Sequence, residues 1–299
     1  MNQNVLFARF KSFILLFLIF PANIFSQEDT TEVLSANDKG KVVSDSSRHS
    51  FYAGTGYGSN MIYLGSTISQ NQPFGYASLT YGFKDEFFAS ASIFHLKEID
   101  PFVAFYNFSL NYSHTFNSWF DLSLGVSGYQ TTKSLTDKLF SNFMFGDITL
   151  GVDWKLIYSR FSFDGLLSKE SQGYLQIKNS RYFQTPQFFN DKIYLSFDPY
   201  VNLLFGTLIE TDSSPVTSKM VTHPKKRWGS GSANSSAATT SYSDKFGLME
   251  IDFGLPVDIN FEIVTLEAEA SYVLPTYTDE YFPGPKGFVF LLSAFFRIW

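Results

Sequence analysis

Apolar and polar residues alternate with a period of two over most of this chain. In the segment 102–114, one parity is apolar or aromatic from Phe102 to Tyr112, whereas the other carries Asn107, Ser109 and Asn111. Successive side chains of a β-strand point to opposite faces. The pattern therefore predicts a strand with one apolar and one polar face.

The same split recurs in later segments, each of which is long for a strand. These segments are 120–128, 144–156, 193–205, 247–259, 263–274 and 288–298. No Asp, Glu, Lys or Arg stands on their apolar parities, and the parity of 247–259 includes Met249. Soluble strands average about 5–6 residues, whereas a tilted transmembrane strand needs about 9–11. The length and the charge-free parity together predict strands that cross a membrane.

Aromatic residues repeatedly flank short turn-like segments, as they do at a membrane–water boundary. The short segments are Phe83–Phe87, Phe116–Phe120, Tyr158–Phe161, Phe189–Asp191 and Ile259–Phe261. The other connections are longer, at about 58–73, 97–101, 130–142, 168–180, 208–245 and 276–286. Eleven connections of these two kinds predict about twelve strands, with both ends of the barrel-forming segment on the short-turn side.

We therefore expect an all-β fold, a transmembrane antiparallel up-and-down β-barrel of about twelve strands, within a range of about ten to fourteen. The least regular strand is the one near 181–188, which contains Pro186 and alternates poorly. Without that hairpin the barrel would have about ten strands.

The first 26 residues have the order of a secretory signal peptide. Arg9 and Lys11 precede the apolar run Phe13–Phe20, and Ser26 offers a small residue before Gln27. The run is too short to cross a bilayer as a helix. We expect cleavage near Ser26–Gln27, a flexible periplasmic tail over 27–47 and a barrel over 48–299.

The composition excludes several functional classes. With 0 Cys, the chain has no disulfide framework, no Cys-ligated metal site and no thiol nucleophile. A net charge of −6 and a pI of about 5.2 argue against nucleic-acid binding. An aromatic content of 19% argues against a disordered chain.

Taken together, the segment from about 49 to 299 resembles the bacterial outer-membrane β-barrel class. The resemblance rests on the export signal, the alternation, the aromatic girdles and the aromatic C-terminus from Ala294 to Trp299. It implies residence in the cell outer membrane, contact with lipid and lipopolysaccharide, a monomeric state and recognition of the C-terminal strand by the barrel-assembly machinery. The apolar parity ends at Ile298, so Trp299 either faces the lumen or lies beyond the membrane edge. The Phe-rich composition and the Ser26–Gln27 site resemble proteins of the Bacteroidota.

The polar parity collects acidic residues, which we expect to line the lumen. They are Asp121, Asp147, Asp153, Asp164, Asp198, Glu250, Asp252, Asp258, Glu267 and Glu269, with the bases Lys155, Arg160 and Arg297. A hairpin centred near Asn260 would set Asp252 opposite Glu269, with Glu250 and Glu267 nearby. Like charges across strands are unfavourable. The cluster is therefore a cation-attracting patch, a hydrated network that stiffens the wall, or an acid–base carboxylate pair.

The four histidines do not form a recognisable catalytic group. His95 and His114 fall on the outward parity near strand ends, and by register His95 lies opposite about Gly75 and Phe102, and His114 opposite about Phe83. No Ser stands there to serve as the nucleophile of a lipase. His49 and His223 complete the set, and the sequence contains no recognisable catalytic motif. We expect no enzyme activity, no cofactor and no metal.

The longest loop, about 208–245, contains a basic patch followed by a flexible Ser/Gly/Ala/Thr tract. The patch consists of Lys225, Lys226, Arg227 and Trp228, and it could touch anionic lipopolysaccharide or surface glycan. Alternatively the loop is a solvated tip, or it folds into the lumen and plugs it.

We expect the protein to act as a narrow channel or passive transporter for small solutes with an acidic polar lumen. One alternative is a structural or interaction barrel whose loops bind surface glycan or a partner protein. A second alternative is an outer-membrane enzyme that acts on lipid or peptide.

Overall fold

A computed structural model of the chain describes residues 49–138, 142–167, 172–189, 192–211, 214–218, 242–277 and 286–299. The predicted signal peptide 1–26, the tail 27–47, His223 and the basic patch from Lys225 to Trp228 lie outside these residues. Within them, no helix is long and apolar enough to cross a membrane; one short helix, α3 (Lys133–Lys138), follows a strand.

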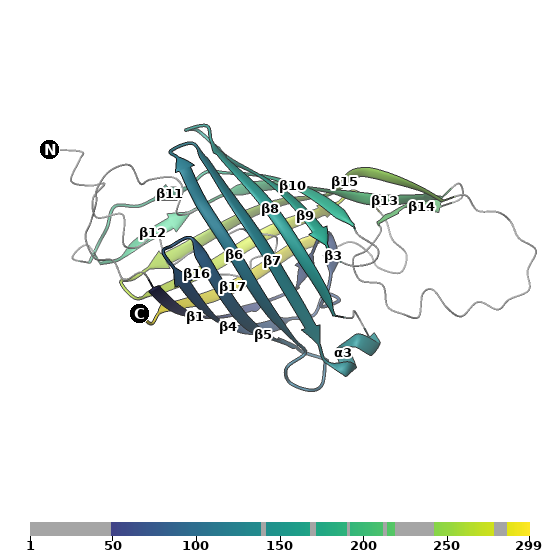
Figure 1. The fold of residues 1–299 in the computed structure, drawn as a ribbon, viewed down its shortest axis with the longest axis horizontal. Helices are drawn as coiled ribbons and strands as arrows, with labels where there is room; N and C mark the ends of the chain where they lie inside the picture. The colour runs from purple at the N-terminus through teal and green to yellow at the C-terminus, as the bar shows by residue number, and fades with distance from the viewer. Residues whose placement is uncertain are drawn as a thin grey trace, which may run out of the picture.

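Antiparallel strands close on themselves into a barrel, and β1 completes the ring by pairing with β17 (Figure 1). The twelve strands of the ring are β1 (His49–Gly58), β4 (Phe74–Phe83), β5 (Phe87–Leu96), β6 (Phe105–Asn117), β7 (Phe120–Thr131), β8 (Phe143–Asp153), β9 (Tyr158–Leu166), β10 (Gly173–Ser180), β13 (Tyr200–Thr211), β15 (Tyr242–Asn260), β16 (Val264–Pro275) and β17 (Gly287–Arg297). The predicted all-β barrel of about twelve strands is confirmed.

Two ring strands continue past an interruption toward the short-turn end. β11 (Phe183–Gln184) extends β10, and β12 (Tyr194–Phe197) extends β13, because Phe183 pairs with Phe197 in the same register as Ser180 with Tyr200. Pro199, which lacks an N–H group, lies at the break between β12 and β13. The hairpin that alternates poorly in sequence is therefore part of the wall.

The prediction of a loop over 168–180 is wrong in its second half, because residues 173–180 form β10. Only two apolar side chains of this strand, Leu175 and Ile177, occupy the outward parity, and the next outward position is Asn179. The outer face is therefore too short and too polar to produce a clear alternation in the sequence.

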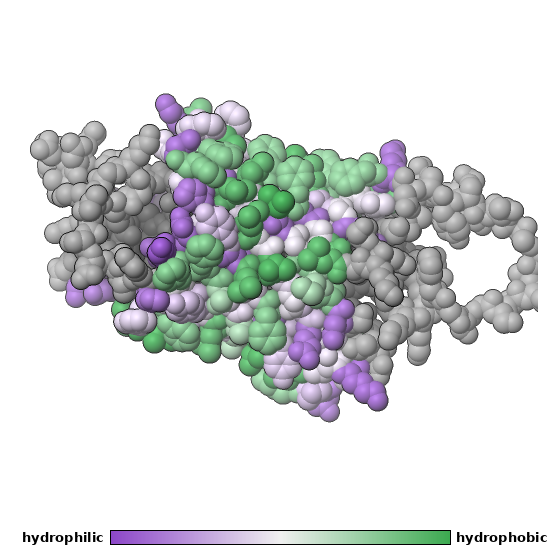
Figure 2. Space-filling view, in the orientation of Figure 1, coloured by the Kyte–Doolittle hydropathy of each residue, from purple (hydrophilic) through white to green (hydrophobic). Residues whose placement is uncertain are grey.

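The outer surface of the barrel is apolar and the inner surface is polar. Outward side chains such as Leu110, Leu266 and Phe290 are exposed, whereas inward Asp121 and Asp252 are buried. Hydrophobic residues gather over the middle of the wall in Figure 2. A closed barrel leaves no unpaired strand edge, so it satisfies its backbone without water.

Met249 is an exception to the predicted parity, since its side chain is buried inside rather than exposed outside. A β-bulge lies here: Leu204 pairs with Glu250, while the next residue, Phe205, pairs with Leu248. The extra residue turns two consecutive side chains, Met249 and Glu250, toward the interior.

At the long-loop end, the connection between β1 and β4 folds into the barrel mouth. Its residues 61–69, here called the plug hairpin, contain the short strands β2 (Ile62–Tyr63) and β3 (Ser66–Thr67). Met61 is fully buried, and Tyr63 meets Phe145 of β8 edge to face with 5.5 Å between ring centroids. Gly65 takes a φ of 76° at the turn, and its carbonyl accepts a hydrogen bond from the Tyr277 hydroxyl.

The plug hairpin packs against rings and aliphatic side chains from most of the wall. The wall residues of this apolar cluster are Phe74, Tyr76, Phe94, Leu96, Phe105, Tyr129, Phe145, Tyr174, Leu204, Leu208 and Met249. They come from eight different strands. These contacts form an apolar layer inside the barrel near its long-loop end.

The lipid-facing assignment predicts opposite outcomes for charges on the two parities. A Leu266→Arg substitution places a charge on the outer wall, which costs about 2–4 kcal/mol at mid-membrane and should impair assembly. Asp252→Asn, on the inner parity, keeps an oxygen acceptor and should assemble normally. Heat-modifiable mobility on semi-native gels measures both; equal tolerance at the two positions would contradict the assignment.

Candidate functional site

Most of the predicted luminal acids do point into the barrel and are buried there. The buried ones are Asp121, Asp147, Asp164, Glu250, Asp252, Asp258 and Glu269, while Asp198 and Glu267 are half-buried. Asp198 lies between β12 and β13, and the other acids come from β7, β8, β9, β15 and β16. The lumen is thus an acid-rich space with the plug hairpin near its long-loop end.

Two predicted luminal charges lie elsewhere. β8 ends at Asp153, and the next four residues form a turn closed by a hydrogen bond from the Trp154 amide to the Ile157 carbonyl. Lys155 is exposed in this turn with a φ of 71°, and its amide donates to the Asp153 carboxylate. Both charges therefore belong to the rim, because the strand is shorter than its alternation suggests.

The predicted register of the β15–β16 hairpin is also wrong. Asp252 pairs with Val273, and Glu269 pairs with Pro256. The turn is centred on Glu262 and Ile263, since the Phe261 amide donates to the Val264 carbonyl, so the register is shifted from that of a turn at Asn260. The shift sets Glu267 opposite Asp258 instead.

Tyr200 nevertheless brings Asp252 and Glu269 together. Its hydroxyl oxygen lies 3.1 Å from Oδ2 of Asp252 and 2.7 Å from Oε1 of Glu269. A phenol has one hydrogen to donate. Both contacts are hydrogen bonds only if the two acceptors share that hydrogen or if one carboxyl group carries its own proton. In either case the Tyr200 hydroxyl bridges the two carboxyl groups.

Other inward acids are held by hydrogen bonds from side chains of adjacent strands or, for Asp121, from β9 across β8. The Tyr158 hydroxyl reaches both carboxylate oxygens of Asp121, at 3.0 and 2.9 Å. The Ser196 hydroxyl donates to Asp258 at 2.9 Å, and Gln176 donates to Asp164 at 3.0 Å. This arrangement supports the expectation of a network that stiffens the wall.

Two buried bases balance part of this acidity. Arg160 of β9 and Lys178 of β10 are cross-strand partners and are both buried on the inner face. The Lys178 ammonium nitrogen lies 4.0 Å from the centroid of the Tyr200 ring, within the range of a cation–π contact. The sequence reasoning missed Lys178 because it placed this residue in a loop, and it missed Tyr158 and Tyr200 because it counted only charges.

Glycines make room for these inward groups. A Cβ atom on Gly254 would overlap the Tyr200 ring, and one on Gly151 would overlap the Tyr158 hydroxyl and the Asp121 carboxylate. A Cβ on Gly125 would overlap the carboxylate of Asp147. The luminal side chains therefore lie flat over glycines of the adjacent strand, which holds each of them in one place.

The described residues contain no group of three or more His, Asp or Glu side chains placed to hold a metal ion. The acidic wall can hold protons or attract mobile cations, but within that part of the chain it has no preformed metal cage.

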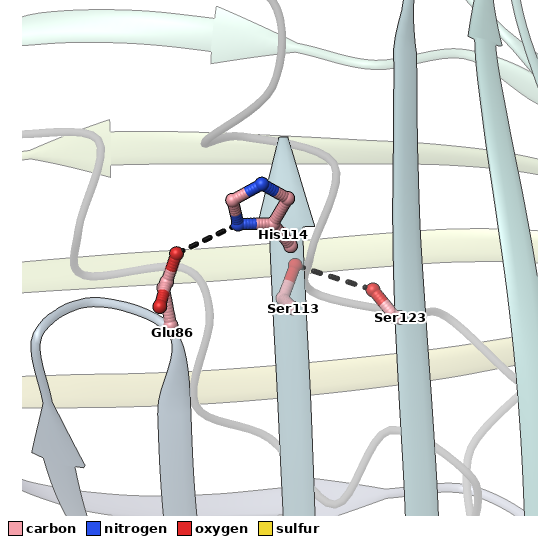
Figure 3. Close-up of polar contacts among 4 residues, drawn as sticks. All are labelled: Glu86, Ser113, His114 and Ser123. Atoms are coloured by element: carbon pink, nitrogen blue, oxygen red, sulfur yellow. Dashed lines mark hydrogen bonds and ion pairs between the residues drawn. The ribbon is translucent and has the colours of Figure 1, made fainter. Parts of the chain in front are cut away.

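Among the described residues, the outward His114 contacts a carboxylate and not a serine hydroxyl. Nδ1 of His114 lies 2.8 Å from Oε1 of Glu86, whereas Ser113 is turned toward Ser123, whose hydroxyl donates to it at 3.2 Å (Figure 3). Ser113 and Ser123 are buried, and His114 is half-buried. His114 pairs with Leu122 rather than lying opposite Phe83, because β6 continues past the β4–β5 turn.

The remaining two described histidines also make structural contacts. His95 pairs with Gly75 as predicted and stacks on Phe102 at 4.3 Å between centroids. His49 stacks on Trp299, which is exposed beyond the end of β17 rather than in the lumen.

No protein-family model matches the chain, and no curated protein matches its sequence. Solved structures with a similar fold include LpxR from Salmonella typhimurium, at 9% identity and a TM-score of 0.43 over 82% of this chain and 99% of that one. The NanC porin is similar at 9% identity and a TM-score of 0.41, over 83% of this chain and 100% of its own. The β-domain of the Bordetella autotransporter BrkA is similar at 9% identity and a TM-score of 0.36, over 84% of this chain and 99% of its own. These proteins are bacterial outer-membrane barrels of differing roles, so the likeness concerns the barrel architecture alone.

The glycine packing predicts a selective loss of stability. Gly254→Ala inserts a methyl group into the space of the Tyr200 ring, and such overpacking typically costs about 1–3 kcal/mol. Gly128→Ala is the matched control, since nothing lies within 4 Å of its added Cβ. Urea unfolding in detergent micelles should show a lower midpoint for the first variant and an unchanged or higher midpoint for the second. Equal midpoints would show that the Tyr200 ring is not held over Gly254.

Proposed function

We propose that the protein is an outer-membrane barrel that conducts small polar or cationic solutes and is closed at rest by the plug hairpin. The observation that supports this proposal most is that the group packed in the barrel mouth belongs to a loop. A loop segment, not the barrel wall, supplies the centre of the apolar layer in the mouth. A loop can move without breaking the ladders of hydrogen bonds that hold the wall together.

The plug hairpin is held mainly by apolar packing, and its strands are very short. Its two strands have only two residues each, and an isolated hairpin of this size has little stability of its own. Among the described residues, the Tyr277 hydroxyl donates to the Gly65 carbonyl and ties the hairpin to the connection after β16. The bond from the Met61 amide to the Ser69 hydroxyl, at 2.9 Å, lies within the hairpin itself. Elements that move are drawn from such low-stability segments.

The acidic wall fits a cationic or neutral solute. Buried carboxylates such as Asp121, Asp252 and Asp258 create a negative potential in a space of low dielectric constant, which attracts cations and repels anions. Eight strands leave a lumen just filled by side chains, and barrels of about 16–18 strands leave an aqueous channel. A twelve-strand barrel lies between these limits, so large solutes are excluded.

A second candidate is an interaction barrel, and one observation favours it. β13 and β15 stay paired as far as Thr211 and Tyr242, whereas β16 pairs with β15 only from Glu250 onward. β14 (Ser214–Ser218) adds to the outer part of β13, so a small sheet extends past the rest of the wall (Figure 1). This sheet leads into the connection that carries Lys225 to Trp228, which would meet lipopolysaccharide, surface glycan or a partner protein.

Export would use the signal peptide 1–26, and assembly would use recognition of β17 by the barrel-assembly machinery. The chain would act as a monomer without a cofactor, in a Gram-negative bacterium of the Bacteroidota type.

Replacing residues 62–67 by two glycines should open the barrel. The expected result in planar bilayers is a steady ohmic current for this variant, against rare or absent openings for the native protein. Tyr277→Phe, which removes the hydroxyl that bonds Gly65, should raise the opening frequency by a smaller amount. A variant that assembles with normal heat-modifiable mobility but carries no current would refute the channel.

Deletion of 212–243 distinguishes the two candidates, since a channel keeps its conductance and an interaction barrel loses its binding. In the open variant, Asp252→Asn should lower the preference for K⁺ over Cl⁻, measured as a smaller reversal potential in a salt gradient. Asp85→Asn is the control on the rim, where it should leave the reversal potential unchanged. If Asp252→Asn left the preference for K⁺ over Cl⁻ unchanged, the result would contradict conduction along the acidic wall.

A further inference from the structure

A polar pair lies on the outer side of the barrel where β6 passes the β4–β5 turn. His114 of β6 and Glu86 of the β4–β5 turn project outward, with Nδ1 and Oε1 2.8 Å apart, and each is about one-third exposed (38% and 35%). They lie at a step in the rim, because the Ser113 amide bonds to the Glu86 carbonyl while β6 continues to Asn117 (Figure 3). The step leaves the polar pair open from the side of the membrane.

A groove of about 370 Å³ lies on the same side of the barrel. It runs across β4 to β7, and the outward residues that border it include Tyr81, Phe87, Ala89, Leu110, Tyr112 and Val126. Ala89 is flanked by Tyr81 and Leu110 on the neighbouring strands. Its small side chain leaves the wall hollow between larger ones.

The groove and the polar pair are continuous. Phe87 follows Glu86 in the chain and lies 4.7 Å from Tyr112, measured between ring centroids. The Tyr112 ring in turn stacks with His114 at 6.3 Å. One end of the apolar groove therefore meets the side chains of His114 and Glu86.

We propose that the groove and this pair together bind one phospholipid with a zwitterionic, primary-ammonium head group, of the phosphatidylethanolamine type. An acyl chain lies in the groove, the ammonium group donates to Glu86, and a phosphate oxygen accepts from His114. Because a carboxylate only accepts hydrogen bonds, Nδ1 of His114 carries the proton in its contact with Glu86. When the ring is protonated, Nε2–H remains free to donate to the phosphate.

The pair is poorly explained as a stabilising contact alone. Exposed ion pairs contribute only about 0–1 kcal/mol, and this one keeps a carboxylate at the edge of an apolar wall. A zwitterionic ligand supplies a partner of opposite charge for each member of the pair. Hydrolysis of the lipid is not part of the proposal, since Ser113 and Ser123 are buried on the inner side.

Native mass spectrometry of the full barrel released from mixed micelles tests the site. The protein is titrated with phosphatidylethanolamine, phosphatidylcholine and phosphatidylglycerol of identical acyl chains. The expected result is one retained phosphatidylethanolamine, held at least fivefold more strongly than the other two. Phosphatidylcholine lacks N–H donors for Glu86, and phosphatidylglycerol lacks the cation. Equal retention of the three lipids by the native protein overturns the proposal without any variant.

Two pairs of variants locate the binding. Glu86→Gln and His114→Asn should each abolish the head-group preference, whereas His95→Asn, a ring-stacked histidine at the opposite rim, should preserve it. Ala89→Leu fills the groove and should lower retention at least fivefold, whereas Ala91→Leu, the next outward position on β5, should not. Normal heat-modifiable mobility confirms that each variant is folded. Retention that falls equally in a variant and its control overturns the site.

Discussion

In hydrocarbon, a backbone N–H or C=O group has no water to bond with, and each one left unpaired costs several kcal/mol. This constraint organises the whole molecule. It requires that β1 find β17 at the far end of the barrel-forming sequence, because a sheet that ended at either strand would expose a full edge. It also determines which side chains suit each face. The wall is a single sheet, so its outer face meets lipid and its inner face lines a confined space. The apolar exterior and the crowded polar interior follow from that single requirement.

The wall was predictable because its signal is repeated on nearly every strand. In segments such as 102–114 and 263–274, alternate side chains face lipid, where a charged side chain is unfavourable. This cost acts on each outward residue independently of its neighbours. The predictions of side-chain direction and strand register were wrong where a local irregularity interrupts the alternation. The bulge that turns Met249 inward adds one residue to β15, and the turn at Glu262–Ile263 shifts its hairpin register. β10 has too few outward apolar residues to be recognised, and Lys178 was lost with it.

The candidate site was predictable in composition but not in arrangement. The excess of inward acids could be counted, yet the contacts that organise them come from tyrosines laid over glycines, as with Tyr200 over Gly254. Those pairings depend on the register between strands. The plug hairpin was beyond prediction for a different reason. Apolar and polar residues do not alternate regularly in this segment. An apolar loop such as Met61–Leu64 therefore has the same sequence pattern whether it enters the barrel mouth or covers it from outside.

The position of the plug hairpin in the chain bears on how the molecule is made. It follows β1 directly, and β1 forms the seam with β17, the ring strand farthest from it in chain order among the described residues. While that seam is unsealed, the cylinder is still a curved sheet, and residues 61–69 need only lie down on its concave side. If β1 and β17 pair last, the wall closes around a segment that is already in place. No apolar loop has to be threaded through a finished opening.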